Sequence, residues 1–310
     1  MQSAYPNYYE KFRCIADQCR HSCCIGWEID IDAQTLRTYR SMSGEMGERL
    51  KRSVTRGKEP HFKLGQDERC PFLNDSNLCD LILFGGEEML CQICADHPRF
   101  RNFLPTRTET GLGLCCEAAA RLILSQREKT KLLITGEAEK EDAQERALLT
   151  FRDRLFSIAQ DRSRSMEARE EMLLELCGVH LGDAAQWVPF YLGLERMDEA
   201  WTQRLNDLGS VQNLNLSPFL HSMSLRETEY EQMLVYFLYR HVPLAYKDGD
   251  VVGKVAFAVL SVRLLRSLGA VQFARCGSFT LDDQIGLARL YSAEIEYSQE
   301  NLDALFDALC

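Results

Sequence analysis

Residues 250–268 read DVVGKVAFAVLSVRLLRSL, and this stretch decides the fold of the C-terminal part of the chain. A helix built from it carries apolar side chains on nearly every side. That pattern is typical of a helix enclosed by other helices rather than one lying on a surface. We therefore predict that these residues form the central helix of an α-helical domain.

Helical spacing of apolar residues continues on both sides of this stretch, whereas alternating strand patterns are scarce. We predict a loop over residues 213–224 and Ser298 as the cap of the last helix. Further helices are predicted over residues 117–129, 139–161, 166–181, 226–241, 281–296 and 300–309, with one or two within 184–208. The predicted fold class is therefore mainly α.

The N-terminal third has a different sequence pattern: its apolar runs are short, Gly and Pro residues interrupt it, and several cysteines occur in pairs. One helix is predicted over Asp32–Met42, with Asp32 as its N-cap, and residues 43–65 are predicted to form a linking loop that could contain one helical turn. The chain is thus expected to contain two domains. Residues 1–116 would form an irregular, cysteine-rich metal-binding module packed on a helical domain of residues 117–310.

Charge and hydropathy exclude some functional classes. The net charge is −10, and phosphate binding needs a basic surface, so nucleic acid is not expected as a partner. Residues 1–11 lack the apolar region of a signal peptide, and no stretch approaches the length of a transmembrane helix. We expect a soluble, cytoplasmic protein with no membrane partner.

Ten of the thirteen cysteines fall at or before Cys116. In a reducing compartment such density indicates metal binding more often than disulfides. Cys177, Cys276 and Cys310 are isolated and are interpreted as incidental thiols. The candidate metal ligands are Cys14, Cys19, Cys23, Cys24, Cys70, Cys79, Cys94 and Cys116.

Thiolates suit both zinc and iron–sulfur clusters, and the spacing matches no standard ferredoxin pattern, so both kinds of centre stay open. Adjacent cysteines rarely bind one ion together, so one member of each vicinal pair is expected to dominate. His97 could be a further ligand or could make a local hydrogen bond. Arg99 is a candidate for holding an anionic group of a cofactor or substrate, or for a surface ion pair.

The order of motifs resembles two known groups of proteins. The segments 70–73 (CPFL), 78–79 (LC) and 94–99, with Cys94, His97, Pro98 and Arg99, resemble the zinc- or iron-chelating module called YkgJ-type. A longer set resembles flagellin lysine-N-methylase, the FliB family: residues 8–14 and 19–32 in the N-terminal third, and residues 236–241 (YFLYRH) and 292–301 near the C-terminus.

The resemblance implies a protein-lysine N-methyltransferase that acts on flagellin in the bacterial cytoplasm. It implies S-adenosylmethionine as methyl donor and a [4Fe–4S] cluster, with zinc as the alternative, on the cysteines. Cys91 and Cys115 are less regular in the family pattern and are ranked lower as ligands. No Gly-rich strand–turn–helix motif of a class I methyltransferase is found, so the methyl donor's site must be built differently.

Lysine methylation needs a neutral amine, and therefore a base or a desolvating pocket. Tyr239, His241 and Glu294 are the candidate catalytic residues, although helix packing and dipole pairing explain Tyr239 and His241 equally well. A second hypothesis remains from another class. In it the chain is a non-catalytic metal-binding protein whose helical domain binds a partner.

Overall fold

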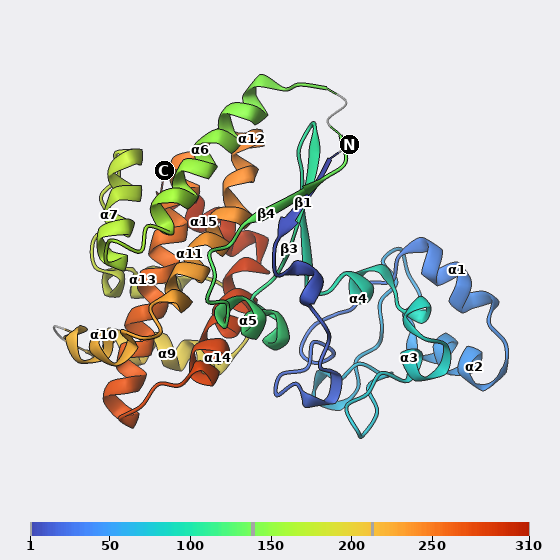
Figure 1. Ribbon diagram of the computed structural model, residues 1–310. Coiled ribbons are helices and arrows are strands. Elements are labelled where there is room, and N and C mark those ends of the chain that lie inside the picture. The colour runs from blue at the N-terminus through green and yellow to red at the C-terminus, as the bar shows by residue number, and fades with distance from the viewer. Residues whose placement is uncertain (1, 138–139, 212–213, 310) are drawn as a thin grey trace. The chain divides into compact units, whose positions relative to one another are not determined.

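The computed structural model describes residues 2–137, 140–211 and 214–309, and it is mainly α-helical, as predicted (Figure 1). It divides the chain into two compact units. Residues 13–99 form the first, which we call the thiol unit. Residues up to Phe12 and from Phe100 onward form the second, which we call the helical unit.

Eleven helices of the helical unit have regular α geometry in the part of the chain that the structure describes. They are α5 (Glu117–Leu124), α6 (Ala143–Ala159), α7 (Met166–Cys177), α8 (Val188–Gly193), α9 (Glu199–Gly209), α10 (Ser217–Met223), α11 (Thr228–His241), α12 (Ala245–Asp248), α13 (Val251–Cys276), α14 (Leu281–Tyr291) and α15 (Gln299–Leu309). A π-helical turn, Ser292–Glu296, continues α14.

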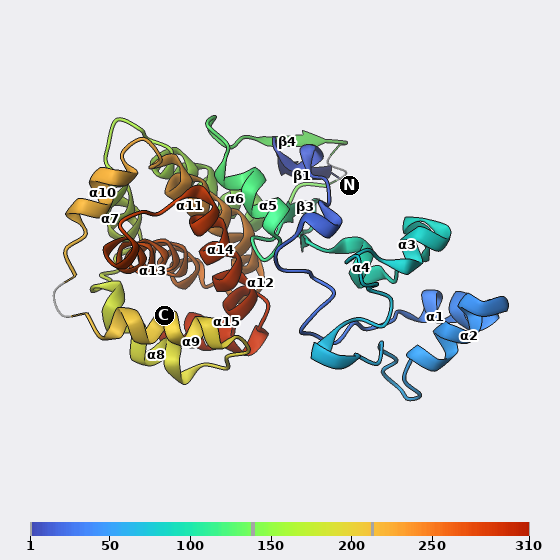
Figure 2. The same cartoon turned by 90° about the horizontal axis from the view of Figure 1, so that it is seen from below.

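Helix α13 occupies the centre of this unit, which confirms the prediction from residues 250–268. It begins after Asp250, whose Oδ1 accepts a hydrogen bond from the backbone N–H of Gly253 at 2.7 Å. Its side chains are buried on all sides through most of its length. Helices α7, α9, α10, α11, α14 and α15 contact it, and Figure 2 shows it enclosed among them. Burial in this apolar core is the main stabilising contribution.

A small mixed sheet accompanies the helices. It is formed by β1 (Gln2–Pro6), β2 (Arg99–Phe103), β3 (Arg107–Leu112) and β4 (Leu132–Thr135), in the order β2-β3-β1-β4. Strand β1 pairs with β3 in parallel, with Ser3 opposite Thr108, and with β4 in antiparallel orientation, with Ala4 opposite Ile134. The sequence analysis missed this sheet because the paired strands are short and far apart in the chain.

The thiol unit holds four short helices: α1 (Ala33–Ser41), α2 (Gly44–Ser53), α3 (Asp80–Gly85) and α4 (Gln92–Asp96). Asp32 caps α1 as predicted, because its Oδ1 accepts the backbone N–H groups of Gln34 and Thr35. The core combines apolar residues such as Ile31, Tyr39 and Phe72 with the thiol side chains of five cysteines. Cysteines therefore take the place of part of the apolar core in this unit.

Two predicted loops were wrong, since each contains a helix. Residues 43–65 contain the ten-residue α2, and residues 213–224 contain α10, whose first turn carries Pro218. Residue 213 itself lies outside the described residues, as does residue 139 at the start of the predicted helix 139–161. A short amphipathic helix next to glycines or a proline gives a weak periodic signal, which explains both errors.

The compact units divide the chain after Phe12 and after Arg99, whereas the sequence analysis divides it at Cys116. Pairing of β1 with β3 accounts for the structural division, because it joins the first residues of the chain to residues 107–112 of the helical unit. No helix within residues 2–137, 140–211 and 214–309 is both long enough and apolar enough to cross a membrane.

Candidate functional site

Five cysteines of the thiol unit come together, and we call them the thiol cluster: Cys24, Cys70, Cys79, Cys91 and Cys94. Each belongs to the apolar core of the unit or packs against it, and each is a free thiol. Cys91 is fully buried, with no exposed surface. The cluster joins three segments that are far apart in the sequence.

Short backbone contacts position these thiols. The backbone N–H of Cys70 donates to the carbonyl oxygen of Cys24 at 2.8 Å, which places these two segments side by side. Cys79 is the N-cap residue of α3, and Cys91 is the N-cap residue of α4. Because Cys94 lies in the first turn of α4, its Sγ comes within 3.5 Å of the Sγ of Cys91.

Neighbouring groups shift the pKa of the thiols at one end of the cluster. A hydrogen bond from Cys23 lowers the pKa of Cys24 to about 7, and Ser22 and the positive charge of Arg69 act in the same direction. Burial raises the pKa of Cys70 to about 12, and thiolates at Cys24, Cys79 and Cys91 raise it further. Cys24 is therefore the thiol that ionises most readily in this part of the cluster.

The thiols of Cys91 and Cys94, at the start of α4, influence each other's ionisation. The hydrogen bond between the two sulfur atoms lowers the pKa of Cys91 and raises that of Cys94, and burial also raises the pKa of Cys94. Further thiolates at Cys24 and Cys70 oppose ionisation of Cys94. Several thiolates can therefore coexist here only when a bound cation offsets their mutual repulsion.

The thiols are donors of the type that a soft metal centre needs, but they are not arranged as a complete ligand set. Among the residues that the structure describes, no three His, Cys, Asp or Glu side chains already stand at the positions of ligands around one metal ion. The cluster nonetheless gathers five thiols, the donor type that zinc and iron–sulfur centres prefer. These residues are consequently the ones that could hold such a centre.

Four of the eight predicted ligands, Cys24, Cys70, Cys79 and Cys94, belong to the thiol cluster. The other four do not belong to this core group. Cys14 is exposed, with Sγ accepting the backbone N–H of Ala16 at 3.4 Å, and Cys19 is half-buried in the same unit. Cys23 is exposed at the edge of the cluster, where it is hydrogen-bonded to Cys24, and Cys116 is the N-cap of α5 in the helical unit. Cys91, which was ranked lower as a ligand, also belongs to the cluster, and its spacing to Cys94 with two residues between them is a common ligand spacing.

His97 is mostly buried beside the cluster's last helix. Burial lowers the pKa of His97 to about 4, and the charge of Arg99 lowers it further, so the imidazole is neutral near neutral pH. Its Nε2 is buried without a hydrogen-bond partner, and its ring lies 6.4 Å from that of Trp27. The Arg99 guanidinium donates to the carbonyl oxygen of Ala95 at 3.3 Å. A neutral imidazole with an open nitrogen has the state required of a metal ligand.

The helical unit contains a second group of interacting side chains, which we call the buried polar cluster: Tyr236, Arg240, His241 and Glu296. The Glu296 carboxylate accepts hydrogen bonds from the Tyr236 hydroxyl at 2.9 Å and from His241 Nε2 at 2.8 Å. Arg240 lies 3.4 Å from the same carboxylate and donates to the Tyr236 hydroxyl at 2.8 Å. This cluster ties α11 to the π-helical turn.

Electrostatics keep Glu296 ionised. Burial acts to raise its pKa, but the charge of Arg240 and the hydrogen bond from His241 outweigh burial, so the pKa of Glu296 is lowered. Burial lowers the pKa of His241, whose Nδ1 is buried without a partner. Since Glu296 and His241 are almost entirely shielded from solvent, the cluster positions helices and is closed to a protein substrate.

The other two candidate catalytic residues also serve the fold. The Tyr239 hydroxyl donates to the carbonyl oxygens of Ala4 and Thr110, both at 3.1 Å, which fastens α11 to the sheet. The Glu294 carboxylate accepts the backbone N–H groups of Met197 and Asp198 at 2.9 and 2.8 Å, at the start of α9. Burial raises the pKa of Glu294 despite these hydrogen bonds.

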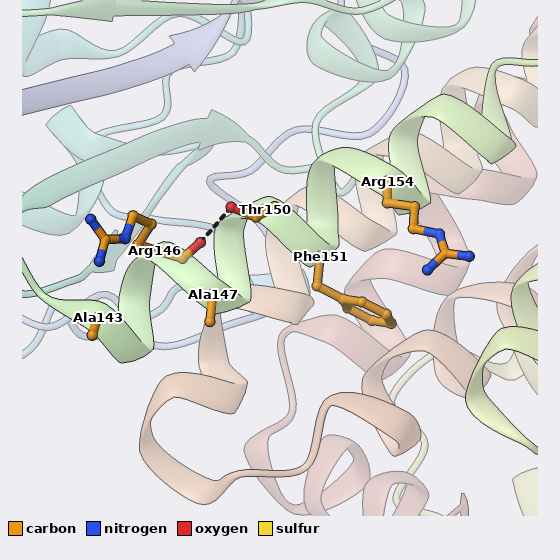
Figure 3. A pocket seen from close by; sticks show the side chains of 6 residues that line it. All are labelled: Ala143, Arg146, Ala147, Thr150, Phe151 and Arg154. Atoms are coloured by element: carbon orange, nitrogen blue, oxygen red, sulfur yellow. Dashed lines mark hydrogen bonds between the residues drawn. The ribbon is translucent and has the colours of Figure 1, made fainter.

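A groove of about 560 Å³ runs along one face of α6 (Figure 3). Its lining consists of Ala143, Arg146, Ala147, Thr150, Phe151 and Arg154, all from this helix. The only titratable groups among them are arginines, which stay protonated at physiological pH. The groove therefore offers a basic surface and no group that could accept a proton from lysine.

Comparison with known proteins finds relatives that each match part of this chain. Lysine-N-methylase of Salmonella typhimurium (strain LT2) is 25% identical over 128 residues, which are 39% of this chain and 32% of that protein. Flagellar biosynthetic protein FliU of Salmonella muenchen is 24% identical over 127 residues, 39% of this chain and 75% of that protein.

The matched segment thus spans about a third of the length of the first of these relatives. No solved structure matches the chain. The family model that matches is described as the FliB lysine N-methylase C-terminal domain, and it covers residues 186–309. Over this range the chain is therefore similar to the FliB lysine N-methylase C-terminal domain, which confirms for this part of the chain the resemblance found in its sequence.

Proposed function

We propose that this chain is a protein-lysine N-methyltransferase that acts on flagellin in the cytoplasm, with S-adenosylmethionine as methyl donor and a thiolate-bound metal centre in the thiol unit. The observation that carries the proposal is the match of residues 186–309 to the FliB lysine N-methylase C-terminal domain. Both C-terminal segments that resembled the family, residues 236–241 and 292–301, lie inside that range.

The buried polar cluster joins those two segments. Tyr236, Arg240 and His241 come from the first, and Glu296 comes from the second. Their hydrogen bonds make the two segments one structural joint of the helical unit.

The reaction joins an amine to a methyl group. The lysine Nζ must first give up a proton to water, because its pKa is about 10.4 in water and only the neutral amine has a lone pair. That lone pair forms the N–C bond as the S–C bond of the sulfonium breaks. The electron pair of the broken bond stays on sulfur, and S-adenosylhomocysteine is released.

The thiol cluster supplies the residues that would hold the metal centre: Cys24, Cys70, Cys79, Cys91 and Cys94. A bound zinc ion or iron–sulfur cluster would neutralise the thiolate charge and, in the iron–sulfur case, add electron-transfer chemistry. The fold of the thiol unit brings these thiols together and shields Cys70 and Cys91, which are buried, from water.

The test is methyl transfer to flagellin by anaerobically purified protein. Radiolabelled methyl groups from S-adenosylmethionine should appear on lysine side chains, and peptide mass spectrometry should locate them. Flagellin with acetylated lysines is the matched control and should accept no label, because acetylation removes the nucleophilic amine. Absence of label on untreated flagellin, with the donor bound and the metal centre intact, would contradict the proposal.

The thiol cluster favours one alternative from another class, a non-catalytic metal-binding protein whose helical unit binds a partner. The same purified protein separates the two hypotheses. Metal bound at the thiols together with measurable binding of S-adenosylhomocysteine supports the methyltransferase. Metal without any affinity for that compound supports the alternative.

A further inference from the structure

Cys91 and Cys94 lie at the start of α4 with their sulfur atoms 3.5 Å apart, and both are free thiols. A disulfide needs about 2.05 Å between its sulfur atoms and about 4.4–6.8 Å between its Cα atoms. The two residues between these cysteines are helical, and helical geometry places the Cα atoms of residues i and i+3 about 5 Å apart. The backbone of this pair therefore already suits a disulfide.

Hydrogen bonds hold the backbone of this turn in place. The backbone N–H of Ala95 donates to the carbonyl oxygen of Cys91 at 3.0 Å, which closes the first turn of α4. The backbone N–H of Gln92 donates to Oδ2 of Asp32 at 2.9 Å, while Oδ1 of the same carboxylate caps α1. The two sulfur atoms are thus presented by an anchored backbone, and joining them requires only rotation of their side chains.

Adjacent cysteines in this chain are less suited to a disulfide. Cys23 and Cys24 are hydrogen-bonded to each other, and Cys115 and Cys116 form a second adjacent pair. Consecutive Cα atoms across a trans peptide lie about 3.8 Å apart, which is below the range of ordinary disulfides, so a ring closed between neighbours is strained. The pair on α4 combines close sulfur atoms with a permissive backbone.

The two thiols of the pair differ in their access to solvent. Cys91 has no exposed surface, whereas Cys94 is half-buried and stands between the exposed residues Ile93 and Ala95. A dissolved oxidant therefore reaches Cys94, and Cys91 reacts only from inside the unit. An accessible thiol beside a buried partner is the arrangement in which a mixed disulfide is resolved by a neighbouring cysteine.

We propose that Cys91 and Cys94 form a reversible disulfide, with a low-molecular-weight disulfide such as oxidised glutathione as the oxidant, and that its formation empties the metal centre. This inference rests on the proposed function, because it takes the thiol cluster as the holder of that centre. Closure of the pair leaves Cys24, Cys70 and Cys79 in the cluster. Three thiols are one short of the four that all-cysteine zinc sites and [4Fe–4S] clusters use.

The reaction exchanges one S–S bond for another in two steps. The Cys94 thiol gives its proton to solvent, and the thiolate attacks one sulfur of oxidised glutathione, so that the other half leaves and takes up a proton. Cys91 then loses its proton and attacks Sγ of Cys94, and the second glutathione leaves as a thiol. Two electrons and two protons thus pass from the protein to the small disulfide, and an added dithiol reverses the sequence.

The test measures thiol state and metal content in the same samples of full-length, anaerobically purified protein. After exposure to oxidised glutathione the protein is quenched with acid and alkylated. Cleavage after Glu88 and Arg99 then releases peptide 89–99, whose only cysteines are Cys91 and Cys94. In the parent protein this peptide should resist alkylation and be lighter by two hydrogen atoms, and zinc or iron per chain should fall in proportion. Dithiothreitol followed by the same metal, with sulfide for an iron–sulfur centre, should restore both.

Two variants test the order of the steps. Cys91→Ser should stop at the mixed disulfide, with one glutathione on Cys94. Cys94→Ser should keep Cys91 as a free thiol, because the oxidant does not reach it. Cys276→Ser is the matched control, since Cys276 is an exposed, isolated cysteine at the end of α13, and this variant should form the disulfide and lose metal as the parent protein does. The result for peptide 89–99 of the parent protein does not depend on the folding of any variant.

Two outcomes overturn the inference and leave the proposed function standing. One is free thiols in peptide 89–99 under conditions in which the exposed Cys276 of the parent protein has taken up glutathione. The other is a disulfide in that peptide with full metal content, because the pair would then lie outside the ligand set. Reduced parent protein that holds no metal and transfers no methyl label would instead overturn the proposed function, and the link between disulfide and metal would fall with it.

Discussion

The imidazole of His241 is hydrogen-bonded to the carboxylate of Glu296, with 2.8 Å between Nε2 and Oε1, and both side chains are shielded from solvent. The bond connects the last turn of α11 to the π-helical turn after α14. It makes the stability of the helical unit depend on the protonation of two groups that are far apart in the sequence.

Acidification should destabilise the protein through His241. Burial lowers the pKa of His241 below its ordinary value of 6.5; Arg240 and Lys254 act in the same direction, and Glu296 opposes them. As pH falls below about 6.5, the unfolded chain binds a proton that the folded chain refuses, so the free energy of unfolding decreases. His241→Gln should flatten this decrease between about pH 6.5 and 5, measured by urea unfolding.

The exposed His221 provides the control for that experiment. His221→Gln should leave the pH dependence of the unfolding free energy as it is in the parent protein. His97 contributes to the same slope, since burial lowers its pKa too, so some pH dependence should remain in His241→Gln. Equal slopes for the parent protein and His241→Gln would show that His241 titrates normally in the folded state.

Neutralising Glu296 should lower the free energy of unfolding by more than neutralising a surface carboxylate does. Glu296→Gln leaves the largely buried Arg240 without its counter-charge, and breaking such a pair from one side costs about 3–5 kcal/mol. Glu199→Gln, at an exposed position in the first turn of α9, should cost under about 1 kcal/mol. Chemical denaturation of the two variants checks the difference, and similar losses would contradict it.

A side chain at Gly113 should destabilise the protein. A Cβ atom at this residue would lie 2.4 Å from the hydroxyl oxygen of Tyr297 and 3.3 Å from the Sγ of Cys115. Gly113→Ala is expected to lower the free energy of unfolding by about 1–3 kcal/mol, the usual cost of overpacking. Adding Tyr297→Phe, which removes the clashing hydroxyl, should recover part of the loss.

Gly286, in the middle of α14, serves as the opposite case. Nothing lies within 4 Å of a Cβ built there, so Gly286→Ala should raise the free energy of unfolding by about 0.5–1 kcal/mol. Thermal or urea unfolding measures both variants. Destabilisation by Gly286→Ala, or none by Gly113→Ala, would refute this account of the local packing.

Metal content should depend on the thiol cluster and not on distant cysteines. Cys91→Ser and Cys94→Ser should each lower bound zinc or iron per chain substantially, because serine oxygen is a poor ligand for both. Cys276→Ser, at an exposed position at the end of α13, should leave the metal content unchanged. Elemental analysis of anaerobically purified protein measures this. Full metal content in both cluster variants would remove Cys91 and Cys94 from the ligand set.

Local chemistry explains which parts of the fold could be predicted. Asp32 carries a side-chain acceptor at the right place before a periodic stretch, and it caps α1. The apolar run 250–268 leaves no polar face, so α13 has to be central. In both cases the information lies within one stretch of chain.

The sheet could not be predicted in this way. Strands β1 and β3 are separated by about a hundred residues, and their parallel register depends on the whole intervening chain returning to the same place. The convergence of Cys24 with Cys70 is non-local in the same sense. Spacing identified the residue type, but not which distant thiols would meet in the folded unit.

The parallel pairing of β1 with β3 determines how the thiol unit is connected to the rest of the chain. The polypeptide departs from the helical unit just after β1 and rejoins it just before β2 and β3, so residues 13–99 constitute an insertion whose two connections are anchored in a single sheet. Replacing residues 13–99 by a short linker would therefore interrupt the chain only beside this sheet and would leave the helices around α13 continuous.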